Sequence, residues 1–437
     1  MATLAIRGGE PVRTGSWPVW PIYDERELQG VREVLESRCW CALPYIFEGK
    51  GRDFSESKVA QLEQAYAAYH DCAYGIAVDS GSAALLISYA AAGVGHGDEV
   101  IMPPRTFVTT AAAALALGAI PVFVDIEAEW LNLDPTAIEA AITERTKAIV
   151  PVHCGGIPCD MDAIMAIAQR HHLMVIGDAC HAHGSEWRGR KVAAAAHLSA
   201  FSFQQDKSLT AGEGGMIVTN DEVLGARCRK LGQRVGQDEI GRFEEMGWNF
   251  RMSEFAGAIV LAQFGRLDDL ISVKEANAAH LASALAGVTA AVRFPTRDPR
   301  MTRLSHLYPT LHYDAEALGG LPAARSAEAL SAEGIPCSAV TAVRALHQHP
   351  MFVEKRFDPG ILRVYGKELD YTRTRCPVAE GYAGKFLSLP QTVLLGSQQD
   401  MDLFAEAVAK IRDATGELVE SGKAGAGTSR GEKRPDR

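Results

Sequence analysis

The chain has 437 residues, a formal net charge of −10 and a pI of about 5.8. This acidic balance argues against a nucleic-acid-binding surface, which is usually basic. No apolar run approaches the ~20 residues of a membrane span, and the N-terminus lacks the apolar core of a signal peptide. We therefore expect a cytoplasmic protein with neither a nucleic-acid nor a membrane partner.

The order of predicted elements indicates an α/β fold in the first two thirds of the chain. An irregular arm over residues 1–20 precedes two segments with helical spacing, and short apolar runs then alternate with helical segments. The expected helices are 24–37, 56–69, 83–91 and 109–117, and the expected strands are 73–78, 99–102, 120–124, 148–152, 174–176 and 216–218. Such alternation predicts a mostly parallel sheet, with the active site at the carboxyl ends of its strands.

The pattern changes after about residue 280 and predicts a smaller α+β domain. Its expected elements are a strand at 308–313, a helix at 326–333, a short apolar run at 361–364 and an amphipathic helix at 398–415. One hydrophobic core rarely organises a chain of this length. The expected parts are an arm (1–20), a large domain (21–275), a small C-terminal domain (276–418) and a disordered Gly-rich, charged tail (419–437).

Nine cysteines occur without a repeated spacing. In a chain of this length such usage indicates reduced, mostly buried thiols rather than disulfides. We therefore expect no metal site.

An aspartate, Asp178, ends the apolar run that begins at Val175. If its carboxylate faced a pyridine nitrogen, the negative charge would keep that nitrogen protonated, which is the electron sink that pyridoxal phosphate (PLP) chemistry requires. The residue alone is equally compatible with a helix N-cap, where aspartate is favoured.

A lysine, Lys207, follows a second short apolar run and precedes the turn Gly212-Glu-Gly-Gly215. A lysine in a partly apolar, glycine-flanked pocket can have a depressed pKa and then forms a Schiff base readily. Most lysines, however, are solvated surface residues.

Asp178 and Lys207, with the glycine-rich turn, resemble fold-type-I PLP enzymes and most closely the sugar aminotransferases of the DegT/StrS type. Further motifs of that family occur in order between about residues 20 and 415. They are Val78–Ala84, Gly97–Phe107, Pro151–His153, Cys159–Asp162, Gly247–Met252, Glu333–Pro336, His347–Pro350 and Cys376–Glu380. The resemblance implies the α/β aminotransferase fold, with Lys207 carrying the cofactor and Asp178 facing its ring.

The resemblance also implies a phosphate site built from Ser82, Ala83 and Ser202. A phosphate favours the N–H groups of a helix N-terminus, and the segment that opens with Ser80-Gly81 offers a strand end followed by a helix. Without the resemblance, the same segment is also compatible with an ordinary capped helix.

Two further residues receive roles from the resemblance. Phe107 matches the aromatic residue that stacks on the cofactor ring, although its apolar nature would also suit a core position. Asn249 matches an asparagine that reaches the phosphate from the neighbouring subunit, which implies a homodimer with shared active sites.

Some positions depart from the family pattern or keep two interpretations. His181 stands where many members have glutamine, near the cofactor's phenolic oxygen. A histidine at this position, followed by His183-Gly184, resembles the branch that acts on keto-cyclitols and the related aminohydroxybenzoate synthases. Arg105 and Arg251 are candidates for binding a substrate anion, although each could instead form a structural ion pair. Asp206, directly before the lysine, has no assigned role.

The sequence therefore predicts a PLP-dependent aminotransferase that moves an amino group from glutamate or glutamine to a keto-cyclitol or keto-sugar in aminocyclitol-type secondary metabolism. One alternative is a PLP-dependent dehydratase or aromatase of the aminohydroxybenzoate synthase type. Another is a non-catalytic partner subunit with the same fold, against which the presence of both Lys207 and Asp178 counts.

Overall fold

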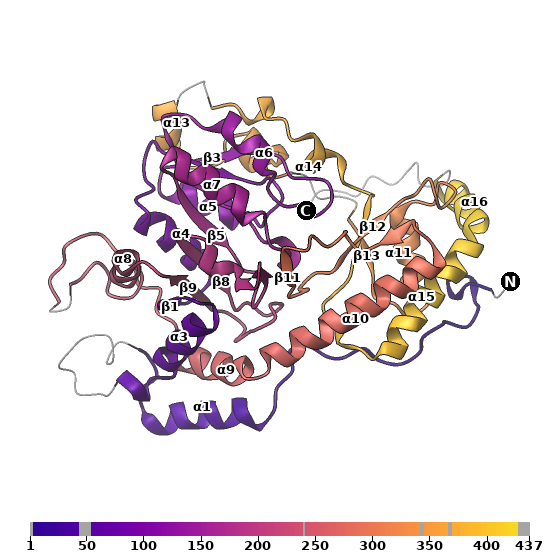
Figure 1. The fold of residues 1–437 in the computed structure, drawn as a ribbon, viewed down its shortest axis with the longest axis horizontal. Helices are drawn as coiled ribbons and strands as arrows, with labels where there is room; N and C mark the ends of the chain where they lie inside the picture. Colours follow the sequence, from indigo (N-terminus) through magenta and orange to yellow (C-terminus); the bar gives the residue numbers. More distant parts are fainter. Residues whose placement is uncertain (1–2, 43–53, 239–240, 341–344, 366–368, 427–437) are drawn as a thin grey trace, which may run out of the picture.

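A seven-stranded sheet forms the centre of the computed structural model, which describes residues 3–42, 54–238, 241–340, 345–365 and 369–426 (Figure 1). The strands are β1 Tyr74–Val78, β2 Glu99–Met102, β3 Ile120–Phe123, β4 Thr146–Ile149, β5 Met174–Asp178, β8 Leu198–Ser202 and β9 Gly215–Thr219. Their order is β1-β9-β8-β5-β4-β2-β3. Only β9 runs antiparallel to its neighbours, β1 and β8, and the other pairs are parallel. The predicted α/β fold with a mostly parallel sheet is therefore confirmed.

Helices cover both faces of this sheet because successive strand residues point to opposite sides. On β1, for example, Ile76 and Val78 belong to one buried cluster and Ala77 belongs to another. The first cluster includes residues of α4 Gly81–Ala91, α5 Thr109–Ala116 and α8 Glu222–Gly232, and the second includes residues of α3 Lys58–Tyr69, α7 Met161–His171 and α9 Glu254–Phe264. Helix α1 (Glu25–Ser37) packs on α9 and begins in a capping box between Asp24 and Glu27.

A second, four-stranded antiparallel sheet lies at the other end of the molecule, with the order β10-β12-β14-β13 (Figure 1). Its strands are β10 Val292–Arg293, β12 Thr310–Tyr313, β13 Ser338–Ala339 and β14 Phe386–Ser388. A third buried cluster joins it to α11 Ala323–Ala332, α15 Gln398–Asp413 and the second half of the long helix α10 Leu267–Val288. The apolar run 361–364 lies in a short helix, α13 (Pro359–Tyr365).

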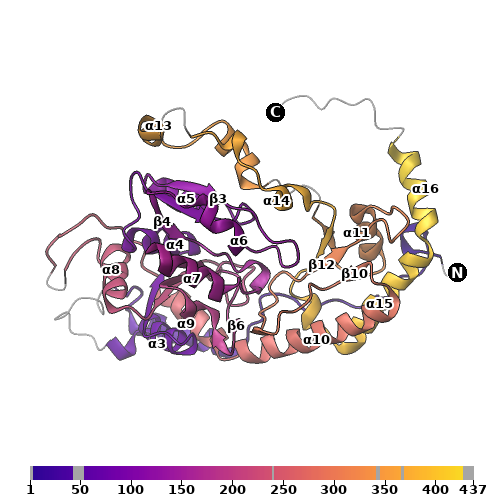
Figure 2. The ribbon, with the colours of Figure 1, turned by 45° about the horizontal axis from the view of Figure 1, so that its top comes forward.

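The division into domains stays a prediction, and the packing of three segments bears on it. The expected boundary at 275/276 falls inside α10, whose first half packs with the large sheet and whose second half packs with the small one. Residues 345–365 and 369–382 return to the first cluster on the large sheet, and Figure 2 shows these segments passing over β3 and α5. Helix α16 (Thr415–Ala426) occupies the start of the expected tail, and residues 427–437 lie outside the described part of the chain.

The N-terminal arm packs against the small sheet before it crosses to the large one. Leu4 belongs to the third cluster, and the buried carboxylate of Glu333 accepts hydrogen bonds from the N–H groups of Ala5 at 2.8 Å and Val12 at 3.1 Å. Arg13 forms an ion pair with Asp400 at 2.7 Å. The arm, predicted as irregular, contains only one short 3-10 turn among its described residues.

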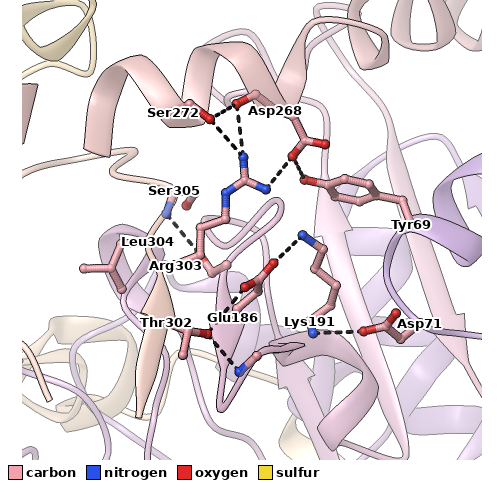
Figure 3. A network of polar contacts seen from close by, with 12 residues as sticks. Tyr69, Asp71, Glu186, Lys191, Asp268, Ser272, Thr302, Arg303, Leu304 and Ser305 are labelled. Carbon is pink, nitrogen blue, oxygen red and sulfur yellow. Dashed lines mark hydrogen bonds and ion pairs between the residues drawn. The ribbon is translucent and has the colours of Figure 1, made fainter. Parts of the chain in front are cut away.

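A polar network connects strand β11 (Met301–Arg303) and the start of α10 to residues around the large sheet (Figure 3). Strand β11 pairs with β6 (Glu186–Trp187), and the guanidinium of Arg303 lies 2.5 Å from Asp268 Oδ1, which also accepts from the hydroxyl of Tyr69 at 2.7 Å. The chain leaving β11 therefore has a fixed direction.

In the described residues, no helix is long and apolar enough to cross a membrane. All nine cysteines are free thiols.

Candidate active site

The carboxylate of Asp178 is buried at the carboxyl end of β5. Its Oδ2 accepts a hydrogen bond from the hydroxyl of Thr110 at 2.8 Å, and its Oδ1 accepts one from the Cys180 N–H at 3.3 Å. Thr110 lies in the first turn of α5 and is itself bound by Thr106 at 2.7 Å. Asp178 is not a helix N-cap in this structure, because no helix begins after it.

Lys207 lies in a compact turn between β8 and β9. Its N–H donates to the carbonyl of Gln204 at 2.9 Å, and its amino nitrogen lies 5.8 Å from the ring centroid of Tyr308. Gly212 closes the turn with φ +83°, a left-handed conformation that favours glycine. The predicted pattern of strand, lysine, glycine turn and strand is thus present. Asp178 ends β5 and Lys207 follows β8, and these two strands pair with each other.

The N-terminus of α4 lies directly against the end of β8. An added Cβ at Gly81 would come within 2.7 Å of the Ser202 Cβ, so only glycine permits this approach. Ser82 is exposed and donates to Thr109 Oγ1 at 3.3 Å, whereas the Ala83 N–H donates to the capping hydroxyl of Ser80 at 3.1 Å. The three predicted phosphate ligands therefore surround one helix start, where the helix dipole favours an anion.

The imidazole of His181 is held as a neutral ring beside the lysine. Its Nδ1 accepts from the Gly155 N–H at 3.3 Å, which leaves the proton on Nε2. Burial first, and then the nearby charges of Lys207 and Arg105, hold the pKa of His181 well below its usual range. His181 is thus positioned as a hydrogen-bond donor through Nε2.

His183, two residues after His181, is also neutral and supports the end of β8. Its Nε2 donates to the Ser202 carbonyl at 3.0 Å and its Nδ1 accepts from the Tyr66 hydroxyl at 2.7 Å. Burial lowers the pKa of His183 to about 3. The ring therefore supports the phosphate side of the site without adding a charge.

Phe107 and Arg105 lie in the loop between β2 and α5. The side chain of Phe107 is 74% exposed. Arg105 donates to the Leu131 carbonyl at 3.4 Å and lies over the ring of Tyr382.

Asn249 is exposed in the loop that follows α8. The next residue, Phe250, accepts from the Asp79 N–H at 2.9 Å, so the loop passes the end of β1 in its own chain. Arg251 donates to the Gln233 carbonyl at 2.7 Å and so holds this loop through a backbone group, and no ion pair of Arg251 occurs within the described part of the chain.

The side chain of Asp206 is exposed, and after burial its negative charge helps to raise the pKa of Tyr308. The backbone of Asp206 is also used: its N–H donates to Gln204 Oε1 and its carbonyl accepts from Gln391 Nε2, both at 2.9 Å. The acidic side chain thus has no assigned role in this structure.

Sequence reasoning missed three residues of the site, namely Thr110, Gly155 and Tyr308. Thr110 lies three residues after Phe107 on the first turn of a predicted helix, and this spacing is the one local signal that could have indicated it. Gly155 and Tyr308 reach the site through contacts with residues distant in sequence.

These residues fit PLP. The cofactor has an anionic phosphate, a ring nitrogen that must stay protonated and an aldehyde that a lysine captures. The α4 N-terminus packed against Ser202, the buried carboxylate of Asp178 and the amino group of Lys207 provide one match for each. The thiol of Cys180 experiences the charges of both Asp178 and Lys207, which places the two within one small region.

The large mixed sheet and the lysine and carboxylate at its edge define a PLP-dependent enzyme of fold type I. The chain belongs to the DegT/DnrJ/EryC1/StrS aminotransferase family, whose model matches residues 24–408. It is therefore an aminotransferase, and PLP is its cofactor, as predicted. Its substrates are a small amino donor and a keto compound.

Named relatives from Streptoalloteichus tenebrarius cover nearly the whole chain. An L-glutamine:2-deoxy-scyllo-inosose aminotransferase is 36% identical over 95% of this chain and 99% of its own. A putative L-glutamine:3-amino-2,3-dideoxy-scyllo-inosose aminotransferase is 36% identical over 94% of this chain and 97% of its own. Among solved structures, 3-amino-5-hydroxybenzoic acid synthase has a TM-score of 0.78 and 32% identity, covering 93% of this chain and 100% of its own.

Proposed function

We propose that this aminotransferase moves an amino group from L-glutamine or L-glutamate to the ketone of a keto-cyclitol or keto-sugar in aminocyclitol-type secondary metabolism. The observation that carries the proposal is the 36% identity, over nearly the full length, to enzymes whose names pair L-glutamine with a scyllo-inosose. His181 also supports the proposal. A histidine where many members have glutamine resembles the branch that acts on keto-cyclitols, and this histidine is held as a neutral Nε2–H donor.

In this proposal the chain's own residues hold PLP and move one proton. Bound PLP supplies an electron sink that stabilises negative charge on the substrate carbon. Ser82, Ala83 and Ser202 bind its phosphate, Phe107 covers its ring, and Asp178 keeps its ring nitrogen protonated. Lys207, once its amino group is free, transfers the proton at the substrate carbon as acid and base.

The same proposal includes a homodimer with shared active sites and a cytoplasmic location. Asn249 is exposed, and its loop also carries two exposed apolar side chains, Phe243 at 73% and Met246 at 76%. Apolar residues gathered on one exposed loop are typical of an interaction surface. The nine free thiols favour a reducing compartment.

The test is a product assay on the PLP-loaded protein with 2-deoxy-scyllo-inosose, and separately with a nucleotide-linked keto-sugar. With L-glutamine as donor, we expect mass spectrometry to show an amine in place of the ketone, with donor and acceptor giving ping-pong kinetics. Turnover of neither ketone would contradict the proposal.

The match to 3-amino-5-hydroxybenzoic acid synthase supports one further candidate, a dehydratase or aromatase that acts on an amino-cyclohexenone. Such an enzyme would remove water from its substrate, and the aromatic product would absorb in the ultraviolet. The product assay with an amino-cyclohexenone in place of the ketone therefore distinguishes it from transamination.

A further inference from the structure

The long helix α10 carries a lysine whose amino group is buried. Lys274 is 1% exposed, and its Nζ donates to Ser208 Oγ at 3.1 Å and to Gln391 Oε1 at 3.4 Å. Burial lowers the pKa of this amine to about 7. A neutral amine has two N–H groups, which match the two acceptors. Most surface lysines of a helix are solvated, so this placement requires an explanation.

Gln391 ties together the two residues that flank Lys207. Its Oε1 accepts from the Ser208 hydroxyl at 3.3 Å, and its Nε2 donates to the Asp206 carbonyl at 2.9 Å. The side chain is 5% exposed and follows β14 by three residues. One amide from the small sheet therefore contacts the chain immediately before and immediately after Lys207.

We propose that Lys274 and Gln391 are positioning residues for Lys207: together they hold the Asp206 carbonyl before it and the Ser208 hydroxyl after it, and so set where its amino group can reach. Within the turn, the Asp206 N–H donates to Gln204 Oε1 and the Lys207 N–H donates to the Gln204 carbonyl, each at 2.9 Å. Because Lys274 belongs to α10 and Gln391 to the segment after β14, the position of Lys207 depends on how the two sheets are joined. This inference rests on the proposed role of Lys207.

A purely structural role, in which these bonds only hold the two sheets together, makes a different prediction. Asn277 offers the matched control, because it lies one turn along the same helix and donates to the carbonyls of Leu394 at 2.9 Å and Gly396 at 2.7 Å. It joins α10 to the same downstream segment, is equally buried, and has no contact with the Lys207 turn among its hydrogen bonds.

The experiment compares Lys274→Met, Gln391→Met and Asn277→Leu with the unmodified protein. The first readout is the rate at which the apoprotein takes up PLP, which is monitored through the cofactor's visible absorbance. The other readouts are kcat, KM and the thermal unfolding midpoint. For Lys274→Met and Gln391→Met we expect uptake and kcat to fall on the order of tenfold with KM within about twofold, since misplacing a reacting group lowers rate more than binding. Asn277→Leu should lower the unfolding midpoint and leave uptake near the unmodified rate.

Two outcomes would overturn the inference. One is unchanged uptake in both methionine variants, and the other is an equal loss in Asn277→Leu. If Lys274→Met does not fold, Ser208→Ala removes the bonds of Lys274 and Gln391 to Ser208 with the loss of a single hydroxyl, and its uptake rate decides the question. PLP uptake does not depend on which ketone is accepted, so a wrong acceptor would leave this result intact. Full turnover by Lys207→Ala would instead contradict the role of Lys207 itself.

Discussion

The Thr110 hydroxyl lies 2.8 Å from Oδ2 of Asp178, so a residue of α5 orients the carboxylate that ends β5. Thr110 is fully buried and its hydroxyl also meets that of Thr106 at 2.7 Å. The carboxylate therefore has a fixed orientation before any ligand is bound.

We expect Asp178→Asn to retain bound PLP and to lose most turnover. A neutral amide cannot hold the ring nitrogen protonated, and a charge-assisted hydrogen bond is worth about 1.5–3 kcal/mol, on the order of tenfold to a hundredfold in kcat. Thr110→Val removes only the orienting bond and keeps the charge, so we expect a smaller loss, on the order of tenfold, from the low end of the same range of about 1.5–3 kcal/mol. Steady-state kinetics check both values, and near-normal turnover by Asp178→Asn would contradict the assignment.

Lys207→Ala should abolish both activity and the visible absorbance of lysine-bound PLP. The reason is that the amino group both captures the cofactor and moves the proton at the substrate carbon. Absorbance spectra of the purified variant, with its circular dichroism as a control for folding, test this. A folded variant with full turnover would show that another residue carries the cofactor.

If Asn249 acts across a dimer interface, two inactive variants should complement each other. Mixed dimers of Lys207→Ala and Asn249→Ala chains then contain one site with both lesions and one site with neither, and activity returns after subunit exchange. The loop also passes Asp79 of its own chain, where Phe250 accepts from the Asp79 N–H. If Asn249 acts within that chain, every site keeps one lesion and mixing restores nothing.

The buried amine of Lys274 should make stability rise with pH above neutrality. Its pKa is about 7 in the folded protein against a reference value of 10.5, so between these values only the unfolded chain binds the proton. The free energy of unfolding therefore rises by up to about 1.4 kcal/mol per pH unit from pH 7 toward 10.5, and the contribution is lost as the pH falls to 7. The nearby titratable groups, His183 and His306, have lowered pKa values and do not titrate in this window.

Urea denaturation of the unmodified protein and of Lys274→Met at pH 7, 8 and 9 measures this contribution. We expect the stability of the unmodified protein relative to the variant to increase steadily with pH. A difference that does not change with pH would mean that the amine titrates at its ordinary pKa.

The strands of the large sheet could be predicted from the sequence because each is a short apolar run bounded by polar or glycine residues. β2 and β3 begin at the predicted residues, and β5 extends from the predicted run to Asp178. Helix α3 starts two residues later than expected, because Ser57 caps it after a short 3-10 turn.

Contacts between distant segments could not be predicted in this way. Gly155 meets His181 only because β4 and β5 are neighbours in the sheet, and Tyr308 reaches Lys207 only because β11 is fixed to β6. Lys274 has the local sequence of an ordinary helical lysine, and nothing near it in the chain indicates that its partners are Ser208 and Gln391.

The placement of the N-terminal arm has a consequence for the order in which the protein is completed during synthesis. The arm leaves the ribosome before its partners Glu333 and Asp400, which lie 328 residues after Ala5 and 387 residues after Arg13. At a translation rate of about 5–20 residues per second, the arm waits tens of seconds for them. Further along, the Trp20 indole donates to the Gln205 carbonyl, two residues before Lys207. The residues of the arm are therefore among the last to dock, and the lysine turn is completed only after Gln391, which bonds Asp206 and Ser208, has emerged.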